Sequence, residues 1–223
     1  MFTGLAAANN PRLNLKLKPF GLRRGALCVL KFAGLRRMEM LLAKVRTCTL
    51  CDGLPLGPRP LLQASATARL LIAGQAPGRI THARGVPFDD ASGQRLRDWL
   101  GLTPAQFYDP GRVAIMPMGF CFPGKGRSGD LPPRPECAPA WRAQLLAMMP
   151  NIALTLIIGR HALAWHSATK RTLTDLARAD DLPQGLAVLP HPSPRNNRWL
   201  AQNPWFEADM LPTLRHKITS VLT

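Results

Sequence analysis

Short, fully apolar runs alternate along this chain with longer segments whose apolar residues recur at helical spacing. Short apolar runs without polar alternation are typical of parallel strands that are covered on both faces. The expected strands are residues 69–74, 112–116, 153–158 and 186–189. The expected helices are residues 38–46, 92–101, 137–149, 159–167 and most of 204–222, with Ser92 as the cap of the second. Residues 54–60 and 122–135 are rich in proline and glycine and predict irregular loops.

Strands that alternate with helices predict an α/β fold with a parallel sheet between two helical layers. In such sheets ligands bind outside the carboxyl ends of the strands. Gln75 follows the first expected strand, Pro117 the second and His191 the fourth. We therefore expect these three residues at one edge of the sheet. The pattern shows no internal repeat, and we expect one domain over residues 38–223.

The charge of the chain points to a polyanionic partner. Its 223 residues carry a formal net charge of +16, which favours nucleic acid, although a high arginine content can also reflect genome composition. Residues 1–37 hold eight of the basic residues and no acidic one. We expect this basic leader to be disordered or an over-extended start that precedes the true Met38 or Met40. A mitochondrial transit peptide and a DNA-binding arm are alternatives.

Four cysteines have a spacing that suits metal ligation. Cys48 and Cys51 form a C-x2-C pair, whereas Cys121 and Cys137 stand alone. Such a set can ligate one [4Fe–4S] cluster. Zinc is the alternative cofactor, although its sites usually pair two short knuckles, and scattered buried thiols are a third reading. Cys28 is left over, and an odd number of cysteines argues against a disulfide framework.

Three further motifs complete the pattern, namely G-Q-A-P-G at residues 74–78, G-V-P-F at 85–88 and H-P-S at 191–193. In this order and spacing, with sixteen positions from Cys121 to Cys137, they resemble the uracil-DNA glycosylase superfamily, most closely its iron–sulfur branch, family 4. The resemblance covers roughly residues 44–220. The turn at residues 191–196 (H-P-S-P-R-N) is more similar to the single-strand-selective glycosylases.

The resemblance implies a three-layer α/β/α sandwich with a central four-stranded parallel sheet, a [4Fe–4S] cluster and base excision from DNA. His191 would donate to the departing base, Phe88 would stack on it, and Gln75 would position the attacking water. Such enzymes hold the target base outside the stack. The residues expected to bind the base are Gly74, Ala76, Pro77, Gly78, Phe88 and Pro117.

Two positions depart from the family pattern. Gln75 stands where the family has a glutamate, and an amide cannot accept a proton from water as a carboxylate does. Pro117 stands where the family has an asparagine that reads uracil. Candidate replacements for the glutamate that activates water are His82, Asp89 and Asp90. Both aspartates could instead simply cap the following helix.

Polar and basic residues in two loops are expected to contact DNA. For the loop that follows His191, the alternative is a solvated polar loop without a DNA contact. The first loop contains Lys125, Arg127 and Arg134, and we expect the metal cluster to fix it structurally. The second loop follows His191. Its candidate DNA contacts are Ser193, Arg195, Asn196, Asn197 and Arg198.

We therefore expect a DNA glycosylase of base excision repair that removes uracil or a related deaminated base. The alternative is a catalytically weak or inactive iron–sulfur protein of the same fold that binds nucleic acid. An electron carrier or a dinucleotide-binding enzyme fits the motifs poorly. We expect a monomer that acts on DNA, with a preference for single strands, in the cytoplasm of a bacterium at the nucleoid, and no membrane association.

Overall fold

A computed structural model describes residues 24–127, 129–167, 169–179 and 181–223, with side chains from residue 34 onward. Four strands build its central sheet, and each matches one of the expected strands. They are β1 (Leu70–Ala73), β2 (Val113–Ile115), β5 (Leu154–Ile158) and β6 (Leu186–Leu189). Most of the basic leader, residues 1–23, lies outside the described residues, and so does the side chain of Cys28.

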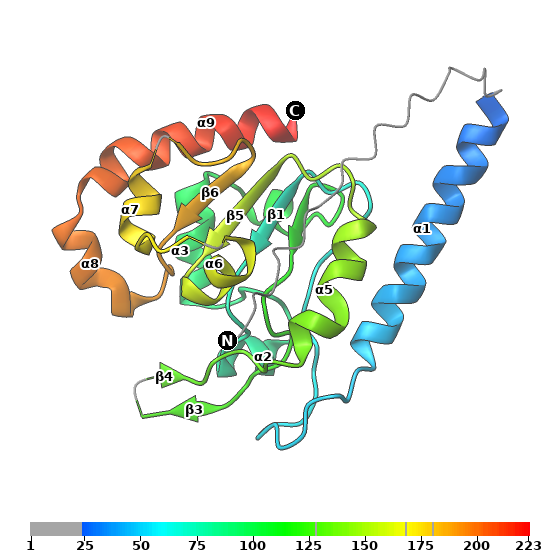
Figure 1. Ribbon diagram of the computed structural model, residues 1–223, viewed down its shortest axis with the longest axis horizontal. Coiled ribbons are helices and arrows are strands. Elements are labelled where there is room, and N and C mark those ends of the chain that lie inside the picture. Colours follow the sequence, from blue (N-terminus) through cyan, green and yellow to red (C-terminus); the bar gives the residue numbers. More distant parts are fainter. Residues whose placement is uncertain (1–23, 128, 168, 180) are drawn as a thin grey trace, which may run out of the picture.

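The sheet is parallel throughout, in the order β2-β1-β5-β6. Ile72 of β1 lies opposite Ile115 of β2 and Leu156 of β5, and Ile157 of β5 lies opposite Val188 of β6. Every strand therefore ends at the same edge. The predicted four-stranded parallel sheet is confirmed (Figure 1).

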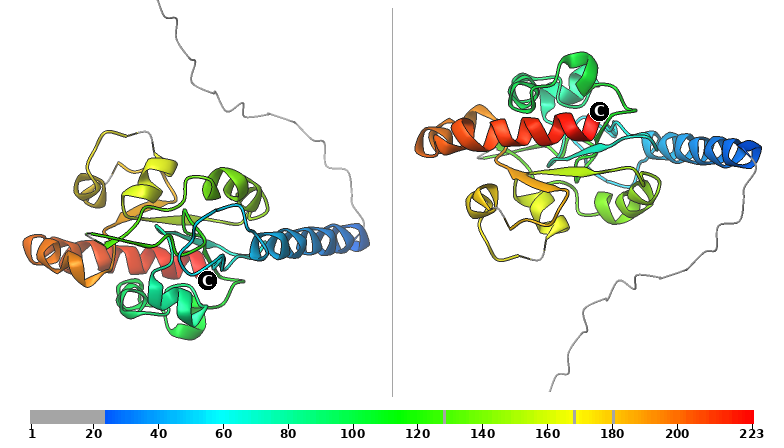
Figure 2. Two further views of the ribbon diagram at one scale, coloured as in Figure 1. Left: turned by 90° about the horizontal axis from the view of Figure 1, so that it is seen from below. Right: turned by 90° about the horizontal axis from the view of Figure 1, so that it is seen from above.

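Alternate residues of the strands pack into the layers above and below the sheet. Leu70 and Ile72 face a core built with α3 (Ala91–Leu100), the short α4 (Pro104–Phe107) and α9 (Leu211–Leu222). Leu71 and Ala73 face the opposite layer. The helices of that layer are α1 (Arg24–Arg46), α5 (Cys137–Ala147), α6 (Arg160–His166) and α7 (Leu173–Arg178). Figure 2 shows the sheet between these two helical layers, as predicted.

Two predicted helix starts are wrong. The first helix, α1, begins at Arg24 rather than at residue 38. The helix α3 is capped by Asp90 and not by Ser92, because the extended backbone of Asp90 lets its carboxylate accept a hydrogen bond from Gly93 N at 2.8 Å. Ser92 already lies inside the first turn.

The segment predicted as an irregular loop between Cys121 and Cys137 contains a short antiparallel hairpin. Its strands are β3 (Lys125–Gly126) and β4 (Gly129–Asp130), and Lys125 pairs with Asp130. Leu131 N donates to Gly124 O at 2.8 Å and closes its base. The hairpin projects from the body of the protein in Figure 1.

The remaining elements are short, and sequence periodicity did not indicate most of them. They are α2 (Arg79–Arg84), the 3-10 turn η1 (Pro194–Asn196), α8 (Asn197–Gln202) and the π-helical η2 (Phe206–Met210), which leads into α9. Among the helices of the described ranges, we find none with the length and apolar character to cross a membrane.

Candidate active site

A cavity of about 490 Å³ opens at the carboxyl edge of the sheet. All four strands lead into it: Gln75 follows β1, Pro117 follows β2, Arg160 and His161 follow β5, and His191 follows β6. The prediction that Gln75, Pro117 and His191 meet at one edge is confirmed. The expected site residues that line the cavity are Gly74, Gln75, Ala76, Pro77, Gly78, Phe88, Pro117, His191, Ser193, Arg195 and Asn196.

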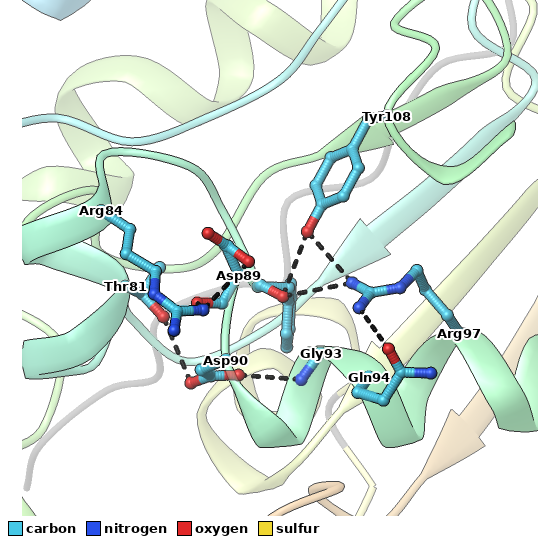
Figure 3. Close-up of polar contacts among 9 residues, drawn as sticks. Thr81, Arg84, Asp89, Asp90, Gly93, Gln94, Arg97 and Tyr108 are labelled. Carbon is cyan, nitrogen blue, oxygen red and sulfur yellow. Dashed lines mark hydrogen bonds and ion pairs between the residues drawn. The ribbon is translucent and has the colours of Figure 1, made fainter. Parts of the chain in front are cut away.

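Two of the proposed catalytic residues do not line this cavity. The His82 side chain is buried on α2, with its ring centroid 6.3 Å from that of Phe122. Among the residues that the structure describes, its Nδ1 finds no hydrogen-bond partner. Burial lowers the pKa of His82, and the nearby Arg59 lowers it further. Asp89 instead pairs with Arg84 at 3.2 Å (Figure 3). The expected DNA contacts Lys125, Arg127, Asn197 and Arg198 also lie outside the cavity lining, whereas Asp90 belongs to it.

His191 is held by its own turn in one tautomer. Ser193 N donates to His191 Nδ1 at 3.2 Å, and Asn196 Nδ2 donates to the carbonyl oxygen of His191 at 2.6 Å. Burial lowers the pKa of His191, although Asp90 and Asp130 oppose this shift. The ring is therefore neutral near pH 7, and because Nδ1 accepts a hydrogen bond, the proton stands on Nε2. His191 enters the cavity as a neutral hydrogen-bond donor.

Phe88 adopts a strained backbone conformation at the cavity wall. Its φ of 54° lies in the left-handed region, which is uncommon for a bulky residue and recurs at functional sites. The ring lies over the glycine turn, since a Cβ at Gly74 would stand 3.4 Å from Phe88 Cζ. The ring also meets Phe107 edge-on at 6.3 Å between centroids. The tip of the aromatic ring therefore lies beside the backbone of the glycine turn.

Two side chains hold the carbonyl group of Phe88. Tyr108 Oη donates to Phe88 O at 3.2 Å, and Arg97 Nη1 donates to the same oxygen at 3.4 Å (Figure 3). Gly93 is required beneath this carbonyl, because a Cβ there would lie 1.6 Å from Phe88 O. The conformation of Phe88 is therefore fixed by several independent contacts.

The side chain of Gln75 is engaged with the hairpin. Gln75 Nε2 donates to Leu131 O at 3.3 Å. The backbone of the turn is tied to the segment after β2, because Met118 N donates to Gly74 O and Gly119 N donates to Gln75 O. Gln75 therefore links the glycine turn to the residue that follows β4.

Sequence reasoning missed several ionisable residues of the cavity. Arg160 and His161 open α6, where Arg160 Nε donates to His161 Nε2 at 3.4 Å, and burial lowers the pKa of His161. The rule that placed Gln75 and His191 at the strand ends would have found both residues after β5. Asp130 of the hairpin also lines the cavity, and its Oδ2 lies 3.3 Å from the place of a Cβ at Gly78.

The four cysteines come together away from this cavity. Cys48, Cys51, Cys121 and Cys137 all line one small pocket with Arg134. Hydrogen-bond donors point at the sulfurs: Phe120 N lies 3.4 Å from Cys137 Sγ, and Trp141 Nε1 lies 3.3 Å from Cys48 Sγ. Burial raises the pKa of Cys137 to about 12. In the described part of the chain, no group of three or more His, Cys, Asp or Glu residues is arranged to hold a metal ion.

A buried arginine connects the cysteine pocket to the cavity. Arg142 on α5 is fully buried, and Nη1 donates to Met116 O at 2.8 Å and to Pro117 O at 3.4 Å. Its Nη2 lies 2.7 Å from His166 Nε2. Burial lowers the pKa of Arg142 to about 10, and the nearby Cys137 opposes this shift. Arg142 therefore places a buried positive charge between Cys137 and the strand end that carries Pro117.

Comparison with known proteins identifies the family. A solution NMR structure from Methanosarcina acetivorans, described with reservation as a uracil DNA glycosylase, is 19% identical with a TM-score of 0.38, over 69% of this chain and 92% of that chain. That likeness is too distant to support an argument. The family model of the uracil DNA glycosylase superfamily, however, matches residues 63–215. This match spans more than half of the chain and includes the glycine turn, Phe88 and His191, so the chain belongs to the uracil DNA glycosylase superfamily.

Proposed function

We propose that the protein is a DNA glycosylase that hydrolyses the N-glycosidic bond of uracil or a related deaminated base. The observation that carries this proposal is the tautomer of His191, whose Nδ1 accepts from Ser193 N and whose proton therefore stands on Nε2, inside a cavity walled by Phe88 and the glycine turn. Negative charge grows on a departing pyrimidine or purine as its bond to the sugar breaks. A fixed neutral donor at the cavity stabilises that charge through its own N–H group, and it does not first have to take up a second proton.

Phe88 supplies the binding surface for the flipped base. Stacking on an aromatic ring is worth about 1–3 kcal/mol per base and does not depend on the identity of the base. The backbone of Gly74 packs directly against the same ring, so the base would stack on the part of the ring that the turn leaves uncovered. Pro117 offers no side-chain hydrogen bond at this cavity, so we propose that backbone groups contact the edge of the base.

Basic side chains at the cavity suit a nucleic acid backbone. Arg160 and Arg195 line it, and Arg198 lies one helical turn beyond Arg195 on α8. Phosphate contacts of this kind supply most of the affinity of such proteins for DNA and make it depend on salt. We propose DNA as the substrate polymer, with single strands preferred because an unpaired base leaves the stack at the lowest cost.

We further propose that the protein belongs to the iron–sulfur branch and that Cys48, Cys51, Cys121 and Cys137 hold one [4Fe–4S] cluster. Support comes from the shared pocket and from the N–H donors at Cys48 and Cys137, which suit thiolates better than neutral thiols. A cluster takes one thiolate for each iron, so its ligands need not meet at a single point. The buried charge of Arg142 near Cys137 would offset the negative charge of such a cluster.

The cluster would act as a structural staple. It would join the C-x2-C segment to both ends of the loop that carries the β3–β4 hairpin. Protein purified without oxygen should be brown, and replacing any of the four cysteines by serine should abolish the colour. Cys28→Ser is the matched control and should keep it. A colourless protein with stoichiometric zinc would show that the alternative cofactor occupies the site.

A second function is favoured by the two departures from the family pattern. Gln75 donates its amide to Leu131 O, and Pro117 provides no side-chain donor, so the protein could bind nucleic acid without turnover. Both functions predict DNA binding, and only the first predicts abasic sites.

The deciding experiment incubates the protein with single- and double-stranded oligonucleotides that carry uracil, hypoxanthine or xanthine, followed by scoring of abasic sites. A glycosylase produces abasic sites from at least one of them. Binding of these oligonucleotides without any abasic product supports the binding protein instead.

A further inference from the structure

The proposed hydrolysis lacks an assigned group that accepts the proton of the attacking water. Gln75 cannot accept it, because a neutral amide is not a base. His82 and Asp89 do not line the cavity. Among the described residues, two carboxylates do line it, those of Asp90 and Asp130.

Both carboxylate oxygens of Asp90 accept hydrogen bonds that hold the local structure. Asp90 Oδ1 accepts from Gly93 N at 2.8 Å and caps α3, and Oδ2 accepts from Thr81 Oγ1 at 3.2 Å (Figure 3). A carboxylate that holds a helix cap and a neighbouring hydroxyl has few acceptor sites left for water. Its loss would also expose unsatisfied donors at the start of α3.

Asp130 has a different environment. Its carboxylate makes no side-chain hydrogen bond or ion pair within the part of the chain that the structure describes, and Oδ2 lies against Gly78 at the far end of the glycine turn. Asp130 is exposed, so water reaches it from the cavity. It stands near enough to His191 for its charge to raise the pKa of that ring against the effect of burial.

The hairpin that carries Asp130 is held from three sides. The backbone of Asp130 pairs with Lys125, and Leu131 N donates to Gly124 O at 2.8 Å. The third contact is the donation from Gln75 Nε2 to Leu131 O, the carbonyl next to Asp130 in the chain. A glutamate at position 75 would place a carboxylate against that carbonyl oxygen and lose the contact.

We propose that Asp130 is the general base that accepts a proton from the attacking water, and that Gln75 is a positioning residue that holds the hairpin of Asp130 at the glycine turn. This inference rests on the proposed glycosylase function. In the reaction, the water oxygen bonds to C1′ of the sugar as the C1′–N bond breaks. The electron pair of that bond leaves with the base, which accepts a hydrogen bond from His191 Nε2. One water proton passes to Asp130 and then to the departed base, so the products are a C1′ hydroxyl and the free base.

The first test compares Asp130→Asn with Asp98→Asn in single-turnover excision of uracil from a single-stranded oligonucleotide. Asp98 is an exposed carboxylate on α3 outside the cavity lining. The variant Asp130→Asn should lower the rate by ~10²-fold or more, the usual contribution of a general base, with oligonucleotide binding within about twofold of wild type. Asp98→Asn should match wild type in both respects.

Two further variants separate a chemical role from a structural one. Formate added to Asp130→Ala should restore part of the rate, because a small carboxylate can occupy the vacated space. The variant Gln75→Glu should lower the excision rate. Adding Gln75→Ala to Asp130→Asn should lower the rate little further, because both changes act through the same carboxylate.

The possible outcomes distinguish this inference from the function on which it rests. An active wild type with an equally active Asp130→Asn variant overturns the assignment of Asp130 alone, and so does a rate of Gln75→Glu above wild type. A wild-type protein that releases no base from any substrate overturns the glycosylase function, and the role of Asp130 with it.

Discussion

Tyr108 Oη donates a hydrogen bond to the carbonyl oxygen of Phe88 at 3.2 Å, and the same Tyr108 oxygen lies 3.1 Å from Arg97 Nη1. Tyr108 is the only tyrosine of the chain and comes from the segment after α4, whereas Phe88 precedes α3. The contact joins two separate segments at the one non-glycine residue with positive φ in the described part of the chain. The orientation of the proposed stacking ring therefore depends on a residue that does not line the cavity.

Replacing Tyr108 by phenylalanine should loosen Phe88 without removing it. The variant loses two partly buried hydrogen bonds, the one that Tyr108 donates to Phe88 O and the one that it accepts from Arg97 Nη1. Its free energy of unfolding should therefore fall by about 2 kcal/mol. Binding of a uracil-containing oligonucleotide should weaken, while binding of an abasic oligonucleotide should not. Thr219→Val is the control, because it loses an exposed hydroxyl hydrogen bond on α9, outside the cavity lining. Equal binding by wild type and Tyr108→Phe would show that Phe88 needs no such support.

Removing the ring of Phe88 should separate stacking from backbone strain. Phe88→Ala and Phe88→Gly both lose the stacking surface, so both should bind a flipped base more weakly by about 1–3 kcal/mol. Glycine adopts positive φ without a steric penalty, so Phe88→Gly should unfold at a higher temperature than Phe88→Ala, by a difference of about 1 kcal/mol in stability. The check is thermal unfolding of both variants beside a fluorescence titration with an oligonucleotide. An unchanged affinity in both variants would remove Phe88 from the base-binding site.

Much of this site follows from the sequence because strand ends are simple to locate. The apolar runs predicted the four strands. Parallel pairing then brings Gln75, Pro117 and His191 to the carboxyl edge of the sheet, independently of the loop conformations. The position of His82 could not be derived in this way. It lies on the six-residue helix α2, which is too short for periodicity to show that its side chain turns toward Phe122 and away from the cavity.

Asp130 was missed for a related reason. Proline and glycine in residues 122–135 predicted irregular structure, yet a two-residue pairing of β3 with β4 is enough to return the chain to the glycine turn. Contacts such as that of Gln75 with Leu131 join residues 56 positions apart, and no local pattern indicates them. Sequence reasoning therefore located the strand ends of the site but not the side chains that the hairpin adds.

The contact between Arg142 and His166 predicts a loss of stability in acid. Arg142 donates from Nη2 to His166 Nε2 at 2.7 Å, so His166 must be neutral to accept. Burial, reinforced by Arg142, lowers the pKa of His166 from 6.5 to about 4. The unfolded chain therefore takes up the proton first as the pH falls below 6.5, and stability that is fully present above that pH is lost toward pH 4.

Thermal unfolding between pH 7 and pH 4 measures this effect. Over this range, His166 should account for a fall in the free energy of unfolding on the order of 2–3 kcal/mol. The variant His166→Gln keeps an acceptor but does not titrate, so its unfolding temperature should depend less on pH. The variant His216→Gln, at an exposed position on α9, should behave as wild type. A pH dependence that His166→Gln leaves unchanged would assign the acid loss to other groups.

The basic residues near the cavity predict a salt-dependent affinity for DNA. Arg195→Ala and Arg198→Ala should each weaken binding of single-stranded DNA, and each should reduce the slope of the logarithm of Kd against the logarithm of salt concentration by about 1. Lys217→Ala, on the exposed side of α9, removes an equal charge outside the cavity and should leave the slope unchanged. Three variants with the same slope would indicate that the net charge of the protein, and not these loops, attracts DNA.

The most direct test of the proposed function is single-turnover release of uracil from a single-stranded oligonucleotide by wild type, His191→Ala and His216→Ala. A fixed neutral donor at the departing base predicts that His191→Ala loses on the order of 10²–10³ in rate while DNA binding is kept, because one preorganised donor is worth that much. His216→Ala, at an exposed position on α9 outside the cavity lining, should match wild type. A wild-type rate in His191→Ala, or a wild-type protein that leaves uracil, hypoxanthine and xanthine in place in every strand context, would contradict the account.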